Sequence, residues 1–257
     1  MFRSLSIPKT VLFLFLGDAL LLLGMVVIYW HQHLGDFLSR ILNLGEEAGL
    51  GTWFSSLQWA LVGILAWRLH RTHFQRKERG SFFLLGFPLV FFAFSIDEIA
   101  QIHESLGQIV DQIVMDSNYQ ESWFHLTGVW TIAVGLPVVL CLALLFFLLR
   151  RFFPFRRGGQ LVLLGFLVFF LGALGMETIS NVFQSSQDWG LVIETTLEEG
   201  MEMIGITLLY WGFHNLLVGN RAETALLPIP PSEALGQPSA SLPHPSQSQG
   251  SKRRGTG

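Results

Sequence analysis

Six long apolar segments dominate the chain and limit the folds that it can adopt. A helix needs about 20 mostly apolar residues to cross the hydrocarbon core of a bilayer. Segments of about this length cover residues 10–30, 53–69, 81–106, 127–149, 160–184 and 191–217. Charged residues make up only 14% of the chain, against about 25% in a typical soluble domain. The sequence therefore predicts an all-α fold, a polytopic bundle of six transmembrane helices.

The basic residues are distributed unevenly between the two ends of these segments. Every lysine and arginine except Arg40 lies near a terminus or beside the connections at 70–80 and 150–159. Loops on the cytoplasmic side of a membrane carry such an excess of positive charge. We therefore expect both termini to lie in the cytoplasm.

The composition changes near residue 221, just after the last apolar segment. Proline, serine, glutamine and glycine dominate the remainder, which has too few apolar residues to build a core. We expect a six-helix transmembrane domain over 1–220 and a disordered Pro/Ser-rich cytoplasmic tail over 221–257.

Acidic residues inside the apolar segments are the feature most relevant to function. They are Asp18, Asp97, Glu98, Glu104, Glu177, Glu194, Glu198, Glu199 and Glu202. An ionised side chain at the bilayer centre costs about 2.5–3.5 kcal/mol even on mild insertion scales. We therefore expect these acids to face one another or a wet cavity. Asp18 is expected either to touch the lower edge of that site or to hydrogen-bond across helices through Gln58 or Ser56.

Helical periodicity places most of these acids on three polar faces, one on each of three segments. On a regular helix the members of each face fall within a narrow sector, because residues three and four apart lie on the same side. The faces are Asp97, Gln101, Glu104, Gln108 and Asp111; Glu177, Asn181 and Gln184; and Glu194, Glu198 and Glu202.

The three faces fall at one level, in the extracytoplasmic half of the predicted bundle. The segments at 81–106 and 160–184 run outward and carry their acids late, whereas the segment at 191–217 runs inward and carries them early. Arg40 is the only basic residue on that side. His103 projects about 120° away from Glu104 on a regular helix, so it joins the acids only if the helix bends. Crowded carboxylates cannot all be ionised, so either some are protonated or a cation is bound.

A divalent metal ion is the favoured counter-charge, and a proton-sharing network that fixes helix packing is the alternative. Carboxylate oxygens with imidazole suit Mg, Ca, Mn, Fe or Zn, and helical bundles hold such sites elsewhere. The Glu-x-x-His signature of di-iron proteins is absent. The candidate metal ligands are Asp97, Glu98, His103, Glu104, Glu177, Glu194, Glu198, Glu199 and Glu202.

Such a site fits a metal-dependent membrane enzyme that acts on a lipid or a periplasmic substrate, although no catalytic residue is identified. The alternatives are a cation- or proton-coupled transporter and a non-catalytic subunit of a membrane complex. The inner half of the predicted bundle carries only Asp18 and no internal repeat is visible, which favours an enzyme. The expected partners are the lipid bilayer and either further copies of the chain or a larger complex. Nothing indicates binding to nucleic acid.

Two strings in the chain, SIDEIAQIHE at 95–104 and LEEGMEMIG at 197–205, carry a resemblance. They resemble signatures of a group of uncharacterised bacterial integral membrane proteins. The resemblance covers the segments from 81–106 onward, about half of the chain. It implies a multi-pass protein of the bacterial inner (cytoplasmic) membrane, and it carries no activity and no site residue.

Overall fold

The secondary structure of the chain is helical wherever it can be described. The computed structural model describes residues 7–30, 35–46, 49–78, 80–115, 133, 135–152, 157–180 and 189–225. The elements are α1 (Lys9–Trp30), α2 (Gly35–Leu42), α3 (Leu50–Gln75), the 3₁₀ turn η1 (Phe83–Leu85), α4 (Gly86–Ala100), α5 (Ile102–Met115), α6 (Leu136–Phe152), α7 (Arg157–Phe170), the π-helical turn η4 (Leu171–Met176), α8 (Glu177–Ser180) and α9 (Trp189–Ala225). The predicted all-α fold is confirmed for these residues.

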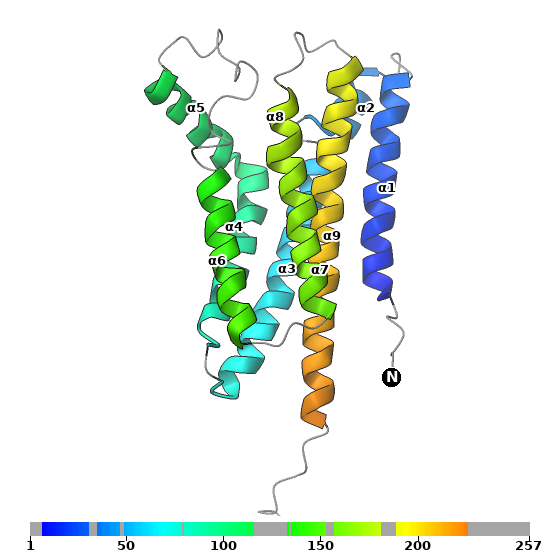
Figure 1. Cartoon of the computed structure of the whole chain (residues 1–257). Coiled ribbons are helices and arrows are strands. Elements are labelled where there is room, and N and C mark those ends of the chain that lie inside the picture. The colour runs from blue at the N-terminus through cyan, green and yellow to red at the C-terminus, as the bar shows by residue number, and fades with distance from the viewer. Residues whose placement is uncertain are drawn as a thin grey trace, which may run out of the picture.

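The long helices stand side by side. Figure 1 shows α1, α3, α4, α6, α7 and α9 running along one common direction. Among the described residues, three stretches are long and apolar enough to cross a bilayer, namely Lys9–Trp30, Phe83–Ala100 and Arg157–Met176. Large apolar side chains on their outer surfaces are exposed, as at Leu12 and Phe13 of α1. In its described parts the chain is thus all-helical, with helices suited to a membrane.

Two of the segments expected as single helices are interrupted. The segment expected over 81–106 opens with η1, and α4 ends at Ala100 before α5 begins at Ile102. The segment expected over 160–184 passes from α7 through the π-helical turn η4 into α8. Part of the segment expected over 127–149 lies outside the described residues, and its described helix α6 begins at Leu136. Both interruptions lie beside acidic residues.

Glycines bring α7 and α9 into backbone contact. A Cβ atom built on Gly205 of α9 would lie 2.6 Å from the amide nitrogen of Phe169 on α7. One built on Gly165 would lie 2.8 Å from the carbonyl oxygen of Gly205, and Gly158 faces Gly212 in the same way further along. Small residues permit such close packing, which drives helix association where lipid removes the hydrophobic effect. The 37-residue α9 is therefore held against α7 over much of its length.

An aromatic core connects α3, α4, α7 and α9. Trp59 of α3 is fully buried and stacks on Phe91 of α4, with ring centroids 5.6 Å apart. It also meets Phe169 of α7 edge-on at 4.9 Å, and Phe91 meets Phe213 of α9 edge-on at 5.3 Å. Aromatic pairs of this kind contribute about 0.5–1.5 kcal/mol each beyond their burial. This core fixes the positions of the helices that carry the acids.

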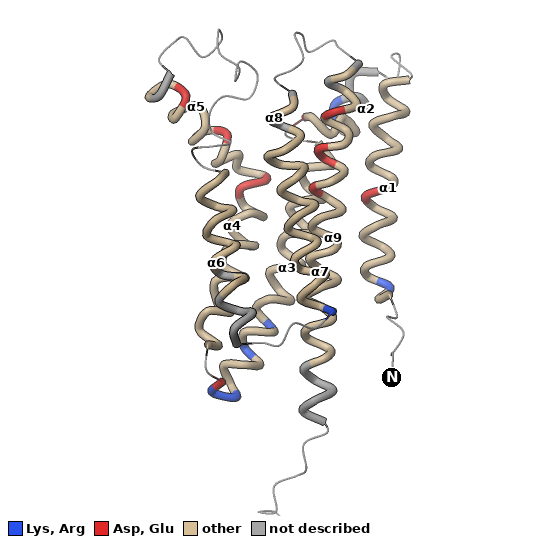
Figure 2. The backbone as a smooth tube through the Cα atoms, viewed as in Figure 1, with Lys and Arg blue, Asp and Glu red and all other residues tan. Residues whose placement is uncertain are grey.

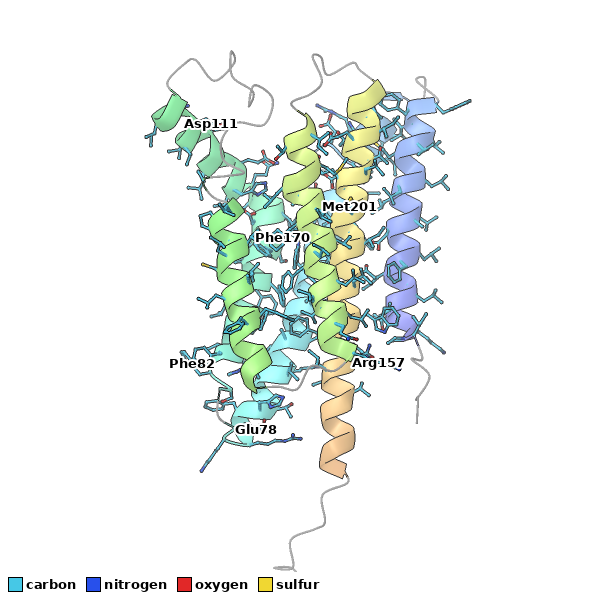
Figure 3. The ribbon with its side chains drawn as sticks, in the orientation of Figure 1. Glu78, Phe82, Asp111, Arg157, Phe170 and Met201 are labelled. Carbon is cyan, nitrogen blue, oxygen red and sulfur yellow. The ribbon has the colours of Figure 1, made fainter. Side chains whose placement is uncertain are left out.

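The charges are separated along the bundle. Lysine and arginine lie mostly at the end where α3 finishes, whereas most of the acids lie in the opposite half (Figure 2). Figure 3 shows Glu78, Phe82 and Arg157 toward the basic end and Asp111 at the opposite end. Arg40 lies on α2, at the acidic end.

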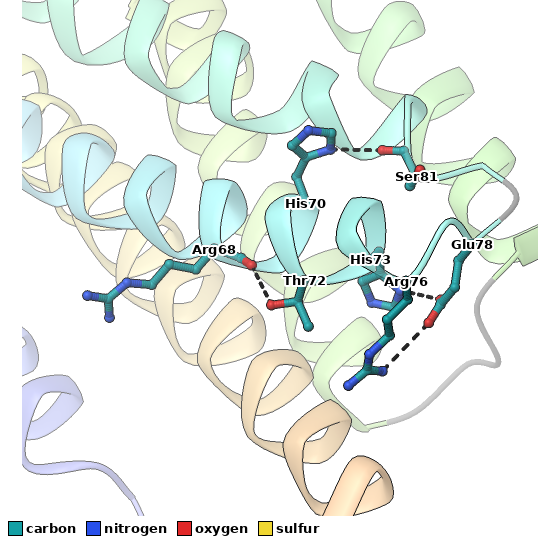
Figure 4. A network of polar contacts seen from close by, with 7 residues as sticks. All are labelled: Arg68, His70, Thr72, His73, Arg76, Glu78 and Ser81. Carbon is teal, nitrogen blue, oxygen red and sulfur yellow. Dashed lines mark hydrogen bonds and ion pairs between the residues drawn. The ribbon is translucent and has the colours of Figure 1, made fainter. Parts of the chain in front are cut away.

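A small polar network fixes the turn between α3 and η1 at the basic end (Figure 4). His73 pairs with Glu78, and Arg76 approaches the same carboxylate with Nη1 3.6 Å from Oε1. His70 donates from Nδ1 to the carbonyl oxygen of Ser81 at 2.9 Å. These contacts tie the end of α3 to the chain that enters α4, so the two helices keep a fixed relation at the end opposite the acids.

Candidate functional site

The break between α4 and α5 builds one wall of the site. Gln101 adopts a left-handed conformation with φ 52° and ψ 41°, which is unfavourable for a residue other than glycine. Its amide donates to the carbonyl oxygen of Asp97 at 2.7 Å, which closes the end of α4. The Asp97 carboxylate then accepts the amide of His103 on Oδ1 at 2.8 Å and so caps the first turn of α5. One aspartate therefore serves both helices.

The same break creates a carboxylate–imidazole pair. Oδ2 of Asp97 lies 2.7 Å from Nδ1 of His103, and Nε2 of His103 lies 4.0 Å from a carboxylate oxygen of Glu104. On the regular helix assumed from the sequence His103 would have pointed away from these acids. The condition for His103 to join the acids is met, because the helix is broken at Gln101, and the residues from Asp97 to Asp111 are divided between α4 and α5.

The charges around His103 favour its protonated form. This residue lies beyond the apolar span that ends at Ala100. Burial of the ring lowers the pKa of His103. The hydrogen bond to Asp97 and the negative charges of Asp97 and two nearby glutamates raise this pKa by more than burial lowers it, so the net pKa lies above the ordinary value. With Nδ1 bound to Asp97, Nε2 is the ring nitrogen on the side of Glu104.

The opposite wall is formed by α9. Glu198, Glu199 and Glu202 line the same cavity as the acids of α4 and α5. The approach of α9 depends on Gly172 in η4, where a Cβ atom would lie 2.9 Å from the carbonyl oxygen of Glu198. π-helical turns are frequent at functional sites, and this one lies directly against the acids.

Between these walls lies a cavity of about 560 Å³, a volume typical of small-molecule sites. Glu98 of α4 and Glu199 of α9 face it from opposite walls and lie close enough for their charges to interact. The described residues that line the cavity include no lysine or arginine. The ionisable lining residues are Asp97, Glu98, His103, Glu104, Glu198, Glu199 and Glu202.

The floor of the cavity is aromatic. Phe94 and Phe169 contact the Trp59 ring, each with its centroid 4.9 Å away, and Phe170 packs edge-on against Phe169 at 5.2 Å. Figure 3 places Phe170 between α7 and the helices α4 and α6. Sequence reasoning missed this floor, since nothing in the pattern distinguishes these rings from those that face lipid.

Seven of the nine predicted metal ligands share the cavity. Glu194 is buried, with 3% of its surface exposed, but is not among the lining residues. Glu177 begins α8, and its side chain lies outside the described part of the structure. That these residues bind a metal stays a prediction.

The donors of this cavity fit a divalent cation in kind, because carboxylate oxygens and imidazole are suitable ligands. Their described side chains are not gathered around one point. Within the described ranges, no three histidine, cysteine, aspartate or glutamate side chains converge closely enough to hold an ion. The predicted metal set therefore shares a cavity without forming an assembled coordination site.

Asp18 of α1 is a buried acid outside the cavity, and it contacts α9 at Thr207, further along that helix than the cavity acids. Asp18 of α1 accepts hydrogen bonds from Nε2 of Gln58 at 2.7 Å and from the hydroxyl of Thr207 at 2.9 Å. Thr207 follows Glu202 by five residues, which is about 7.5 Å along a helix. The expected cross-helix bond through Gln58 is thus present, whereas Ser56 bonds to Ser95 instead.

Comparison with known proteins identifies a family for the chain but does not indicate an activity. A family model described as a domain of unknown function (DUF8692) matches residues 13–216. No curated protein and no solved structure gives a significant match to the chain.

Proposed function

Since the chain belongs to the DUF8692 family of unknown function, we propose a function from its site: a metal-dependent membrane enzyme with an acidic cavity. The cavity would hold a divalent cation and accept its substrate from the extracytoplasmic side of the membrane. The observation that carries this proposal is that Glu98 of α4 and Glu199 of α9 line one cavity together with four more carboxylates and no described lysine or arginine.

The electrostatics of this pair support a bound cation. Two carboxylates that face each other in a low-dielectric cavity repel, and both can be ionised only if positive charge lies between them. No lysine or arginine is found among the described lining residues, and a protonated His103, which is bound to Asp97, would offset only one of the six lining carboxylates. A divalent cation drawn between the wall of α4 and α5 and the wall of α9 would supply it.

The residues of the cavity suit hydrolytic chemistry. Asp97 holds His103 through Nδ1 and leaves Nε2 able to take up or release a proton. A bound divalent ion would activate water or polarise a carbonyl or phosphoryl oxygen. The apolar floor would limit access of bulk water to the reacting group. The assignment of roles within this set is part of the proposal.

Elemental analysis of the purified protein tests whether it binds a divalent metal ion. We expect a stoichiometric divalent ion, and we expect Asp97→Asn and Glu198→Gln each to weaken its binding by more than about tenfold, since each removes a ligand. Glu46→Gln is the matched control, because Glu46 is an exposed acid outside the cavity lining. Its metal content should equal that of the unaltered protein.

Two results would contradict the proposal. Protein without metal would favour proton sharing among the acids, and metal that neither cavity variant removes would place the ion elsewhere. Uptake of a cation into proteoliposomes that depends on Glu198 would indicate a transporter.

We also propose that the bundle spans the membrane six times, with both termini in the cytoplasm of a bacterial cell. The separation of charge seen in Figure 2 supports this orientation through the positive-inside rule. A reporter that is active only in the cytoplasm should work when fused after Ala225. A reporter that is active only after export should work when inserted between α5 and α6, and the reverse pattern would refute the topology.

A further inference from the structure

The cavity has a polar part and an apolar part, and the apolar part has no role in holding a cation. The acids and His103 occupy the part beside the α4–α5 break and the facing turns of α9. Apart from Thr52 and Gln101, the rest of the lining is apolar, and most of it comes from α3, α4, α6, α7 and η4. Its main members are Trp59, Phe94, Val138, Phe169, Phe170 and Leu174.

A polar group lies at the boundary between the two parts. Trp59 is fully buried and lines the cavity, and its indole nitrogen makes no hydrogen bond of regular geometry within the described residues. The carboxylate of Glu98, at the edge of the acidic part, lies within its reach as an acceptor. A ligand oxygen that accepted this buried N–H in regular geometry would be stabilised by it. The donor therefore selects a ligand that places a carbonyl, ester or hydroxyl oxygen at the base of the acidic part.

The seam between α6 and α7 gives the apolar part a route to the bilayer. Val138 of α6 and Phe170 of α7 line the cavity from the two sides of this seam and are only partly buried. Leu140 and Leu171, which lie close to them in sequence, are 59% and 49% exposed and face the lipid. Near the other end of the seam, Gly135 lies so close to Leu174 that a Cβ atom would stand 2.5 Å from its side chain. An apolar chain can thus enter from lipid without passing through water.

We propose that the substrate is an acyl-chain amphiphile with an uncharged polar group, bound with its chain on the aromatic floor and its polar oxygen beside Trp59. This inference rests on the proposed function, since it names the substrate class of the same cavity. The acidic lining disfavours an anionic head group such as a free carboxylate, because like charges repel. The aromatic floor favours an acyl chain, because each methylene that packs against it leaves water and gains close van der Waals contacts.

Photolabelling of the full chain in phosphatidylcholine nanodiscs tests this assignment. The probe is a monoacylglycerol that carries a diazirine in its acyl chain, and labelled peptides are mapped by mass spectrometry. We expect labelling around Phe94 and Phe170 that saturates and is displaced by unlabelled monoacylglycerol. Labelling of the lipid-facing surface of α1, around Leu12 and Phe13, should not saturate and serves as an internal control.

Filling the cavity should remove only the saturable labelling. Ala173→Phe and, separately, Val138→Phe introduce a ring into the apolar part, and each should lower saturable labelling by about tenfold or more. Ala143→Phe is the matched control, because Ala143 is exposed on α6 and does not line the cavity. A fatty acid of the same chain length should compete at least about tenfold less well than the monoacylglycerol.

The outcomes separate this proposal from the metal proposal. Labelling is repeated on protein stripped with a chelator, where saturable labelling should persist because the floor and Trp59 need no ion. Metal binding with no saturable labelling in the cavity would overturn the amphiphile and leave the metal enzyme standing. Labelling that neither filling variant reduces, or equal competition by the fatty acid, would also overturn it. Saturable labelling without any bound metal would support the amphiphile and refute the metal enzyme.

Discussion

Leucine in place of Gly205 is expected to abolish most of the folded protein. The backbones of α7 and α9 touch at this position, where even a Cβ atom would stand 2.6 Å from the Phe169 nitrogen and 2.8 Å from its Cα. Backbone atoms cannot turn aside as a side chain can, so the helices must separate along their length. Overpacking in a core costs about 1–3 kcal/mol and occasionally more, and we expect the upper end of that range or beyond. Thermal unfolding monitored by size-exclusion chromatography in detergent measures the loss.

The same helix pair offers a control with the opposite expectation. Gly159 on α7 has no atom within 4 Å of the Cβ that alanine would add. Gly159→Ala should therefore leave stability unchanged or raise it by up to about 1 kcal/mol through helix propensity. Equal loss of folded protein in both variants would show that glycine matters here for a reason other than the contact between α7 and α9.

Alanine in place of Asp18 is expected to destabilise the bundle by about 2–4 kcal/mol, because it leaves buried donors without acceptors. Asp18 is 2% exposed, and its partners Gln58 and Thr207 are fully buried. Removal of the carboxylate would orphan one amide hydrogen and one hydroxyl, and it would loosen α1 from α3 and α9. The midpoint of thermal unfolding in detergent should fall accordingly.

Asp18→Asn distinguishes lost hydrogen bonds from lost charge. The asparagine oxygen can accept from Gln58, and its amide can donate to Thr207, whose hydroxyl then turns to the carbonyl of the preceding turn. Asp18→Asn should therefore be much milder than Asp18→Ala. If the two variants lose stability equally, the negative charge at this position is what the bundle requires, and the hydrogen-bond account is wrong.

The sequence predicted the class of fold and the region of the site because both follow from periodic patterns. Long apolar segments predict membrane helices. Acidic residues within such segments must face one another across helices, since lipid cannot solvate them. Asp97, Glu198 and Glu202 were located on this argument, and the cavity contains them. The link between Asp18 and Gln58 followed from the same reasoning.

The details that build the site were not accessible from the pattern. Gln101 takes a left-handed conformation although its side chain does not favour one, because Asp97 satisfies the ends of both helices around it. That tertiary and capping effect moved His103 into the site. The aromatic floor was hidden for another reason: phenylalanine on a membrane helix is equally suited to lipid, to a core and to a cavity wall.

The length of α9 has a mechanical consequence. Its 37 residues amount to about 55 Å of helix, well beyond the roughly 30 Å of a hydrocarbon core. Figure 1 shows its far end extending past the other helices. The acids lie toward one end of this rod, and the close contact between Gly165 and Gly205 lies part of the way along it. Because further close contacts at Gly158 and Gly172 hold α9 against α7, the rod cannot pivot on one point, and a displacement of its acidic end would move α7 and the far end of α9 with it.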